Sequence, residues 1–157
     1  MSAFAPTIFW HPFDELSPRQ LHDILKLRAD VFVTEQACAF SDIDGRDPRA
    51  VHALATRHGD LVATARLLGE PAGPVRIGRF VTSPDARGRG LGAALMRDAL
   101  AEIGRRWGEV PVILGAQTRV RDFYARFGFV ACSDVYDEDG IPHVEMRRNP
   151  AAVPPTG

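Results

Sequence analysis

Three glycines and two arginines lie within six consecutive residues, Arg87-Gly88-Arg89-Gly90-Leu91-Gly92. Glycine lets main-chain N–H groups approach an anion because no Cβ stands in the way. Apolar residues at helical spacing follow in residues 91–103, and the N-terminus of a helix carries unpaired N–H donors and a partial positive charge. The segment therefore predicts a loop that binds a diphosphate, with both arginines adding charge-assisted hydrogen bonds.

Two other interpretations of this loop fit less well. A plain turn between a strand and a helix requires neither three glycines nor two arginines. Residues 88–93 also fit the G-x-G-x-x-[GA] pattern of dinucleotide-binding loops, but residues 83–86 separate them from the preceding strand. No acidic residue ends the next apolar strand at 113–117, as that pattern requires, and no Gly-Lys-Ser/Thr follows to make a P-loop.

The elements that must position the loop alternate between strands and helices. Ser17, Pro18 and Gln20 predict a capped helix start, and helical spacing continues through residues 21–32, apolar except for Arg28. The order of elements predicts a mixed α/β sheet rather than a repeating βαβ array. Expected strands cover 8–10, 51–56, 61–68, 77–82, 110–115, 129–136 and 144–147, expected turns cover 58–60 and 138–140, and further helices cover 91–103 and 120–127.

Composition bounds the remaining possibilities. The 157 residues predict a single domain over 1–149 and a flexible tail over 150–157. With 19 basic and 20 acidic residues the net charge is -1, which argues against nucleic acid or an anionic membrane as a partner. No apolar stretch is long enough to span a membrane, and residues 1–11 lack the features of a signal peptide. Only Cys38 and Cys132 occur, so we expect no metal site and two reduced, buried thiols in a cytoplasmic protein.

Several segments resemble the Gcn5-related N-acetyltransferase (GNAT) superfamily, and in particular its ElaA-like branch. The loop at 87–92, which follows a strand ending at 81–82, is similar to the R-x-x-G-x-G acyl-CoA loop of the superfamily. One departure concerns Gln117, because the superfamily often has Asn just after the fifth strand. The segments that carry the resemblance to the branch are 27–36, 77–81, 123–129 and 138–146, and the likeness extends from about residue 13 to residue 147.

The resemblance implies a fold and a cofactor. The fold is a central mixed, largely antiparallel sheet that is flanked by helices and split between its fourth and fifth strands, near Val81 and residues 114–115. Acetyl-CoA would occupy this split, and open strand edges offer the unpaired N–H and C=O groups that a ligand needs. The residues implied to contact acetyl-CoA are Phe80, Val81, Thr82, Arg87, Gly88, Arg89, Gly90, Leu91, Gly92, Ala93, Gln117 and Tyr124.

The resemblance also implies a reaction, in which a primary amine of a small molecule or peptide attacks acetyl-CoA directly in a ternary complex. A main-chain N–H near Val81 would polarise the thioester carbonyl, and Tyr124 would act as general acid for the leaving thiol. Tyr124 also belongs to the apolar stripe of residues 120–127, a pattern that by itself favours packing. Glu35 is the candidate general base; a salt-bridged carboxylate is an equal alternative, and deprotonation through water requires no residue.

The acceptor side is less defined by the sequence. Its candidate residues are Gln36, His52, Glu138 and His143, although the pattern around His143 favours a structural histidine. Residues 41–47, Ser-Asp-Ile-Asp-Gly-Arg-Asp, do not fit an EF-hand because positions 40 and 51 are Phe and Val. They predict a mobile, solvated loop whose acids could attract a cationic amine.

Other interpretations stay open at this level. The same fold could serve as a non-catalytic acyl-CoA-binding sensor. Residues 31–36 also resemble the acyl-homoserine lactone synthases, but the chain is short for that family and its loop is closer to the acetyltransferase pattern. The sequence determines neither the acceptor nor the presence of a homodimer.

Overall fold

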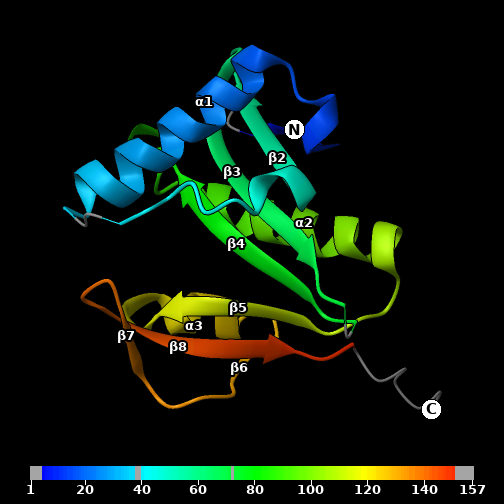
Figure 1. Cartoon of the computed structure of the whole chain (residues 1–157), viewed down its shortest axis with the longest axis vertical. Helices are drawn as coiled ribbons and strands as arrows, with labels where there is room; N and C mark the ends of the chain where they lie inside the picture. The colour runs from blue at the N-terminus through cyan, green and yellow to red at the C-terminus, as the bar shows by residue number, and fades with distance from the viewer. Residues whose placement is uncertain (1–4, 38–39, 72, 151–157) are drawn as a thin grey trace.

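The computed structural model describes residues 5–37, 40–71 and 73–150, so the predicted tail beyond residue 150 and Cys38 lie outside the described residues. Its strands form one mixed sheet in the order β1–β2–β3–β4–β5–β8–β6, with β7 paired to β8 (Figure 1). All neighbouring strands are antiparallel except β4 and β5, which are parallel, and this confirms the predicted fold class. The strands are β1 Thr7–Pro12, β2 Val51–Arg57, β3 Asp60–Gly69, β4 Val75–Thr82, β5 Val112–Gln117, β6 Val130–Ala131, β7 Tyr136–Glu138 and β8 Ile141–Arg148.

Helices cover both faces of this sheet. Helix α1 (Pro18–Arg28) lies across β3 and β4 on one face, and α2 (Leu91–Trp107) lies behind them on the other, while α3 (Arg121–Ala125) packs against β5 (Figure 1). The predicted capping box at the start of α1 is confirmed, because the Ser17 hydroxyl accepts from Gln20 N at 3.1 Å and Gln20 Oε1 accepts from Ser17 N at 2.8 Å. The sheet is therefore an inner layer, with α1 on one face and α2 on the other (Figure 1).

The main core lies between α2 and the sheet. Leu95 and Met96 of α2 are fully buried there. The facing strand positions are small, which lets the helix approach the sheet closely. These small buried residues are Ala53, Ala55, Ala63 and Ala65.

Two of the tight turns follow from the residues that occupy them. His58 and Gly59 join β2 to β3 with φ angles of 52° and 83°, and Asp139 and Gly140 join β7 to β8 with 53° and 84°. Positive φ at both central residues matches the right-handed twist of the strands in a two-residue hairpin. Both turns were predicted from the sequence, and both are confirmed.

The strand predicted over residues 129–136 is present only in part, as two short separate strands. Only Val130–Ala131 and Tyr136–Glu138 pair with β8, and Val135 between them is 60% exposed. The chain leaves the ladder because the hydroxyl of Ser133 accepts from Glu145 N at 2.9 Å, in place of a main-chain partner. Cys132, expected to be buried, is exposed in this segment.

Candidate active site

β4 and β5 are hydrogen-bonded only near their starts. Val75 pairs with Val112 and Arg76 with Ile113, and no later residue of either strand pairs with the other. A cleft of about 1140 Å³ opens where the two strands diverge. The predicted split between the fourth and fifth strands is therefore present, and it leaves main-chain groups of both strands open to a ligand.

A β-bulge in β4 lies beside the split. Between Gly78 and Val81 this strand carries one residue more than β3. Arg79 adopts a φ of 47°, in the left-handed region that side chains rarely occupy. An inserted residue bends the strand and increases its local twist, so the bulge is a structural reason for β4 to turn away from β5.

The bulge also changes which side chains of β4 point toward each face of the sheet. Before it, Ile77 is buried in the core beneath α2. After it, Phe80 packs against that core, whereas Val81 packs with residues of the α1 side. Because side chains alternate along a strand, the extra residue shifts the alternation by one position. Phe80 and Val81 consequently lie on opposite faces at the mouth of the cleft.

Helix α1 changes form before it reaches the cleft. It continues from Arg28 into a π-helix over Ala29–Glu35, closed by a bond from Gln36 N to Val31 O of 3.2 Å. A π-turn contains an extra residue and often marks a functional site. The α-helical spacing predicted through residue 32 therefore ends four residues early, and Glu35 and Gln36 are delivered to the open ends of β4 and β5.

The glycine-rich loop has the predicted geometry. Gly88 and Gly90 have φ angles of 81° and 76°, and α2 begins directly after Gly90. No side chain caps this helix end, so its first N–H groups remain available to an anion. A Cβ on Gly88 or Gly90 would meet nothing within 4 Å, so it is the backbone conformation that requires glycine at both positions.

Arg87, expected on the diphosphate, is bound to Glu35. The Arg87 Nη1 and Nη2 atoms donate to Glu35 Oε1 and Oε2 at 2.5 and 3.0 Å, and Arg87 also donates to Thr82 O at 3.1 Å. The hydrogen bond from Arg87 lowers the pKa of Glu35 below its usual value. A carboxylate with a lowered pKa is a poorer base, so this contact works against the general-base role predicted for Glu35.

Gln36 makes a similar contact with the next predicted cofactor residue. Gln117 Nε2 donates to Gln36 Oε1 at 3.3 Å, and Arg119 Nε donates to Gln117 Oε1 at 2.8 Å. Glu35 and Gln36 are consecutive residues that bind on opposite sides of the split. Glu35 binds Arg87 beyond the end of β4, and Gln36 binds Gln117 at the end of β5.

Tyr124 lies at the cleft among aromatic rings. Its ring makes edge contacts with Phe80, Phe123 and Phe129, with centroids 5.2–6.4 Å apart. Burial raises the pKa of its phenol to about 12. The hydroxyl has no hydrogen bond to any described residue, and Tyr124 lines the cleft. Packing therefore fixes the ring while leaving a protonated hydroxyl for a ligand.

A histidine and a carboxylate meet on the far wall of the cleft. His143 of β8 donates a hydrogen bond from Nδ1 to Ile141 O at 2.8 Å, because a carbonyl oxygen can only accept. Its Nε2 lies 3.1 Å from Glu138 Oε2, and its ring stacks on Tyr136. Nδ1 therefore carries hydrogen, and Nε2 faces the Glu138 carboxylate at the cleft.

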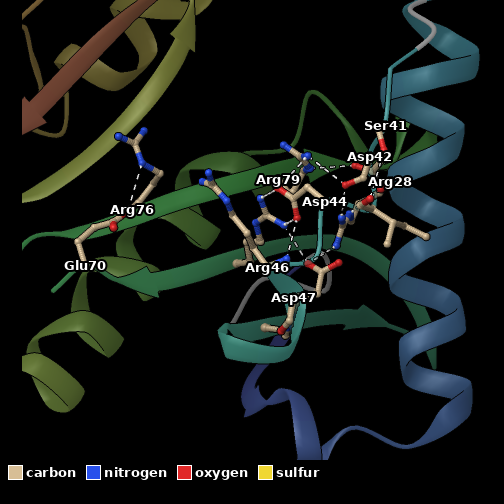
Figure 2. Close-up of polar contacts among 12 residues, drawn as sticks. Arg28, Ser41, Asp42, Asp44, Arg46, Asp47, Glu70, Arg76 and Arg79 are labelled. Carbon is tan, nitrogen blue, oxygen red and sulfur yellow. Dashed lines mark hydrogen bonds and ion pairs between the residues drawn. The ribbon is translucent and has the colours of Figure 1, made fainter.

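A buried network of charges lies beneath the loop 41–49 and was not predicted. Arg28 is 1% exposed; its Nε donates to Asp42 Oδ2 at 3.0 Å and its Nη1 to Asp47 Oδ1 at 2.8 Å (Figure 2). Arg66 joins the network through Asp44 and Asp47, at 2.6 and 3.0 Å. The expectation of a solvated, mobile loop is wrong here, because its acids bind arginines of α1 and β3.

Arg79 completes this network from the β-bulge. Its Nε lies 2.9 Å from Asp42 Oδ1, and its Nη2 donates to Asp42 O at 3.0 Å (Figure 2). The sequence did carry a signal for the network, because Arg28 and Arg66 both interrupt runs of apolar residues. A charge at a core position must be paired, so each required a buried acid.

His52 belongs to the same network rather than to the acceptor site. It is 1% exposed, its Nε2 bonds to Asp47 O at 2.9 Å, and it does not line the cleft. Burial lowers its pKa. The expected contact of His52 with a substrate is therefore not supported, and its role is structural.

The cleft brings together most of the other predicted residues. Gln36, Glu138 and His143 line it on the acceptor side, whereas Glu35 does not. Leu91 is buried in the core, so that only its main chain is open to a cofactor. The predicted cofactor residues that line the cleft are Phe80, Val81, Thr82, Arg87, Gly92, Gln117 and Tyr124, and those outside its lining are Gly88, Arg89, Gly90, Leu91 and Ala93.

The described part of the chain contains neither a cluster of metal ligands nor a membrane-spanning helix. No group of three or more His, Cys, Asp or Glu residues within it could hold a metal ion. No helix within the same ranges is long and apolar enough to cross a membrane.

Comparison with known proteins agrees with this architecture. Residues 22–150 match the family described as the acetyltransferase (GNAT) domain. The chain therefore belongs to the GNAT superfamily of acyl-CoA N-acyltransferases, as the split sheet and the glycine loop indicate.

Its relatives lie in the ElaA-like branch. Protein ElaA of Escherichia coli is 44% identical over 138 residues, which are 85% of this chain and 90% of that protein. The crystal structure of Escherichia coli ElaA has a TM-score of 0.87 at 40% identity and covers 92% of this chain and 99% of that one. An acyl-CoA N-acyltransferase from Pseudomonas aeruginosa has the same TM-score at 43% identity, with the same coverage of 92% and 99%.

Proposed function

We propose that this protein transfers the acetyl group of acetyl-CoA to a primary amine of a small molecule or peptide, by direct attack in a ternary complex. The observation that carries this proposal is the union of three features in one cleft: the split of β4 from β5, the uncapped start of α2, and the unbonded hydroxyl of Tyr124. A module that only bound acyl-CoA would need the first two features but not the third.

Acetyl-CoA would lie along the open edge of β4. Its diphosphate would accept hydrogen bonds from main-chain N–H groups of residues 88–93, where the helix dipole and the absence of a cap favour an anion. Its pantetheine would pair with Phe80, Val81 and Thr82 like an added strand. The thioester would then lie between Val81 and Tyr124, and an N–H near Val81 would polarise its carbonyl.

The proposed chemical step is a direct transfer of the acetyl group from sulfur to nitrogen. The amine nitrogen attacks the thioester carbonyl carbon and a C–N bond forms. As the tetrahedral intermediate collapses, the C–S bond breaks and the nitrogen gives up its second proton, which neutralises the departing thiolate to the free thiol of CoA. Tyr124 donates its O–H to the departing sulfur. Because its pKa of about 12 lies above the value near 8.5 of an ordinary thiol, Tyr124 stabilises the thiolate more by hydrogen bonding than by complete proton transfer.

The proton of the acceptor ammonium needs a separate destination. Glu138 and His143 line the acceptor side, and Glu138 Oε2 lies 3.1 Å from His143 Nε2. We therefore assign the base function to this pair, with Glu138 and His143 taking up the proton that the ammonium loses before attack.

Glu35 has a different role in this proposal. Its contact with Arg87 is bidentate, and both side chains are partly exposed. A bound diphosphate offers Arg87 a stronger anion, so cofactor binding would exchange Glu35 for phosphate. Glu35 would thus hold Arg87 in a defined position until acetyl-CoA arrives.

Substitution of Tyr124 by Phe tests the proposed reaction. We expect kcat for acetyl transfer to fall by about 10²- to 10⁴-fold because the thiolate loses its hydrogen-bond donor. The ring contacts with Phe80 and Phe123 remain, so the affinity for acetyl-CoA in calorimetry and the urea midpoint should stay near wild type. The rate is measured by release of free thiol with a panel of amines, lysyl peptides and N-terminal peptides.

Phe123→Leu serves as the matched control, because it alters the same aromatic cluster without removing a hydroxyl. Turnover of Tyr124→Phe at the wild-type rate would contradict the acid assignment. Tight acetyl-CoA binding without transfer to any amine would instead identify the protein as a sensor module, and absence of binding heat would overturn the cofactor site itself.

A further inference from the structure

The main chain of β4 beside the split is held by a partner strand on one side only. Thr64 and Ala63 of β3 pair with Val81 and Thr82, whereas the described residues of β5 pair with none of β4 after Arg76. A segment with one free edge lacks half of the hydrogen bonds that orient a central strand. The direction of the Val81 N–H therefore depends on further contacts of β4.

Arg79, two residues before Val81, occupies a strained conformation. Its φ of 47° lies in the left-handed region, which is unfavourable for a residue that carries a Cβ. Glycine adopts this conformation freely, yet the bulge places Arg79 there and not the adjacent Gly78. A strained residue of this kind persists only where surrounding contacts hold it.

The Arg79 side chain is held by Asp42. Its Nη2 donates to Asp42 O at 3.0 Å, and its Nε lies 2.9 Å from Asp42 Oδ1. Asp44 Oδ2 lies 3.4 Å from the same Nη2, and the guanidinium lies 5.4 Å from the ring centroid of Phe40. The side chains of Arg79 and Asp42 are 22% and 10% exposed, so their contact is largely shielded from water.

Asp42 also binds the end of α1. Arg28 Nε donates to Asp42 Oδ2 and Arg28 Nη2 donates to Asp42 O, both at 3.0 Å. Arg28 is the last residue of α1, and the π-helix that delivers Glu35 and Gln36 begins directly after it. Asp42 therefore lies between Arg28 and Arg79 and joins the β-bulge to the π-helix (Figure 2).

Asp47 provides a comparison within the same network. Its Oδ1 accepts from Arg28 and from Arg66, at 2.8 and 3.0 Å, and its side chain is 6% exposed. Asp47 is therefore as buried and as strongly paired as Asp42, but its arginine partners lie on α1 and β3 rather than at the bulge.

We propose that Asp42 is a positioning residue for acetyl transfer. By binding Arg79 it keeps the β-bulge in the conformation that directs the Val81 N–H at the thioester carbonyl, and by binding Arg28 it fixes the bulge relative to the π-helix. This inference rests on the proposed function, because it needs a thioester beside Val81. Asp42 does not line the cleft, so its effect on the rate passes through the main chain of β4.

Asp42→Asn tests this role, because it keeps the size of the side chain and the main-chain carbonyl but removes the charge. We expect kcat for acetyl transfer to fall by about 10- to 100-fold, since a small displacement of a group that acts on the reacting atoms has an effect of this size. The Kd of acetyl-CoA in calorimetry should stay within about threefold of wild type, because the diphosphate loop at 88–93 is unchanged. Both are measured under conditions in which circular dichroism shows each variant to be folded.

Asp47→Asn is the matched control. It removes a carboxylate from the same network, so the urea midpoint should fall about as much as in Asp42→Asn. Its kcat should stay within about twofold of wild type, because Asp42 still holds the bulge. An equal loss of kcat in both variants would overturn the inference, since loss of the network as a whole would then account for the effect.

Substitution of Arg79 by Gly separates positioning from stability. Glycine adopts the φ of the bulge without strain, so kcat of Arg79→Gly should exceed that of Arg79→Ala by about fivefold. In the Arg79→Gly background, Asp42→Asn should still lower the urea midpoint through Arg28 but should change kcat by less than about twofold.

Three further results would overturn the inference while leaving acetyl transfer intact. They are a wild-type kcat in Asp42→Asn, an undiminished effect of Asp42→Asn in the Arg79→Gly background, and equal kcat values for Arg79→Gly and Arg79→Ala. The last comparison decides the matter even where Asp42→Asn does not fold. Failure of the wild type to acetylate any amine would overturn the proposed function, and this inference with it.

Discussion

The protein pairs arginine with carboxylates in two contrasting places. Arg28, beneath the loop 41–49, is 1% exposed and binds two buried acids, Asp42 and Asp47. Arg87, at the cofactor loop, is 40% exposed and binds Glu35, which is 39% exposed. Each arginine donates two hydrogen bonds to carboxylate oxygens, but the surroundings of the two arginines differ, and these surroundings decide what each contact does.

The difference is energetic. Removing one partner from a buried ion pair leaves a charge without water or counter-charge, which costs about 3–5 kcal/mol, whereas an exposed pair contributes about 0–1 kcal/mol. The network around Arg28 is therefore a fixed part of the fold. The pair of Arg87 with Glu35 is weak enough for a phosphate to displace it.

Substitution of Arg28 by Met tests the buried network and should have the largest effect on stability. We expect the free energy of unfolding to fall by about 3–5 kcal/mol, because Asp42 and Asp47 each lose one of their two arginine partners and the three acids of the network are left with two arginines. Urea denaturation followed by circular dichroism measures the change. Arg28→Lys keeps the charge without the planar fork and should lose less.

Lys26→Ala is the control for Arg28→Met, since Lys26 lies on the same helix and pairs with Asp30 at 2.7 Å on the surface. Its loss should stay below about 1 kcal/mol. Similar losses for Lys26→Ala and Arg28→Met would show that burial does not distinguish the two kinds of pair.

The network also predicts how stability changes with pH. The hydrogen bond from Arg66 holds the pKa of Asp44 well below its usual value, and burial lowers the pKa of His52. Burial alone would raise the pKa of Asp47, but Arg28 and Arg66 together keep it low. All three groups resist protonation when the protein is folded, so protons bind more readily to the unfolded chain and stability falls as pH falls.

His52 should act first as the pH decreases. Unfolded histidine takes up a proton below about pH 6.5, while unfolded Asp does so only below about pH 4, so the decline between pH 7 and pH 5 belongs to His52. Urea midpoints measured across this range should fall for wild type and stay flatter for His52→Gln. His22→Gln, at an exposed position, should keep the wild-type slope. An unchanged slope in His52→Gln would show that the buried histidine does not titrate on unfolding.

The same contrast explains what the sequence could predict. The capping box at Ser17, the hairpin turn at His58-Gly59 and the glycine loop at 88–92 are local, because neighbouring residues alone determine their main-chain conformation. All three are present as predicted. The family resemblance added the split of the sheet, which no local pattern contains.

Local sequence patterns could not predict contacts between residues that are far apart in the chain. Arg28 and Asp47 are 19 positions apart, and the acidic loop appeared solvated because composition does not reveal a buried partner. Glu35 and Arg87, 52 positions apart, were both selected as functional residues, yet nothing in the sequence indicated that they bind each other. The strand expected over 129–136 is interrupted for a related reason, since a single side chain, Ser133, replaces part of its ladder.

Substitution of Glu35 by Gln tests the exposed pair of Arg87 with Glu35 and should have the smallest effect on stability. Glu35→Gln should change the free energy of unfolding by no more than about 0.5 kcal/mol, because the pair is exposed. Acetyl-CoA should bind about 2- to 5-fold more tightly in calorimetry, since Arg87 no longer has to leave a carboxylate. Arg87→Ala should instead weaken binding by about 10-fold or more.

The opposite signs of these two variants separate a holding role from catalysis. Glu109→Gln, exposed and distant from the cleft, should leave the affinity for acetyl-CoA unchanged. If Glu35 were the general base, Glu35→Gln would lower kcat severely while the Kd of acetyl-CoA stayed constant. A tighter Kd with kcat largely preserved is expected only when the carboxylate and the diphosphate compete for one guanidinium. A phosphate can displace the carboxylate bound to Arg87 but not those bound to Arg28. Only the exposed pair can separate without leaving a buried charge unpaired.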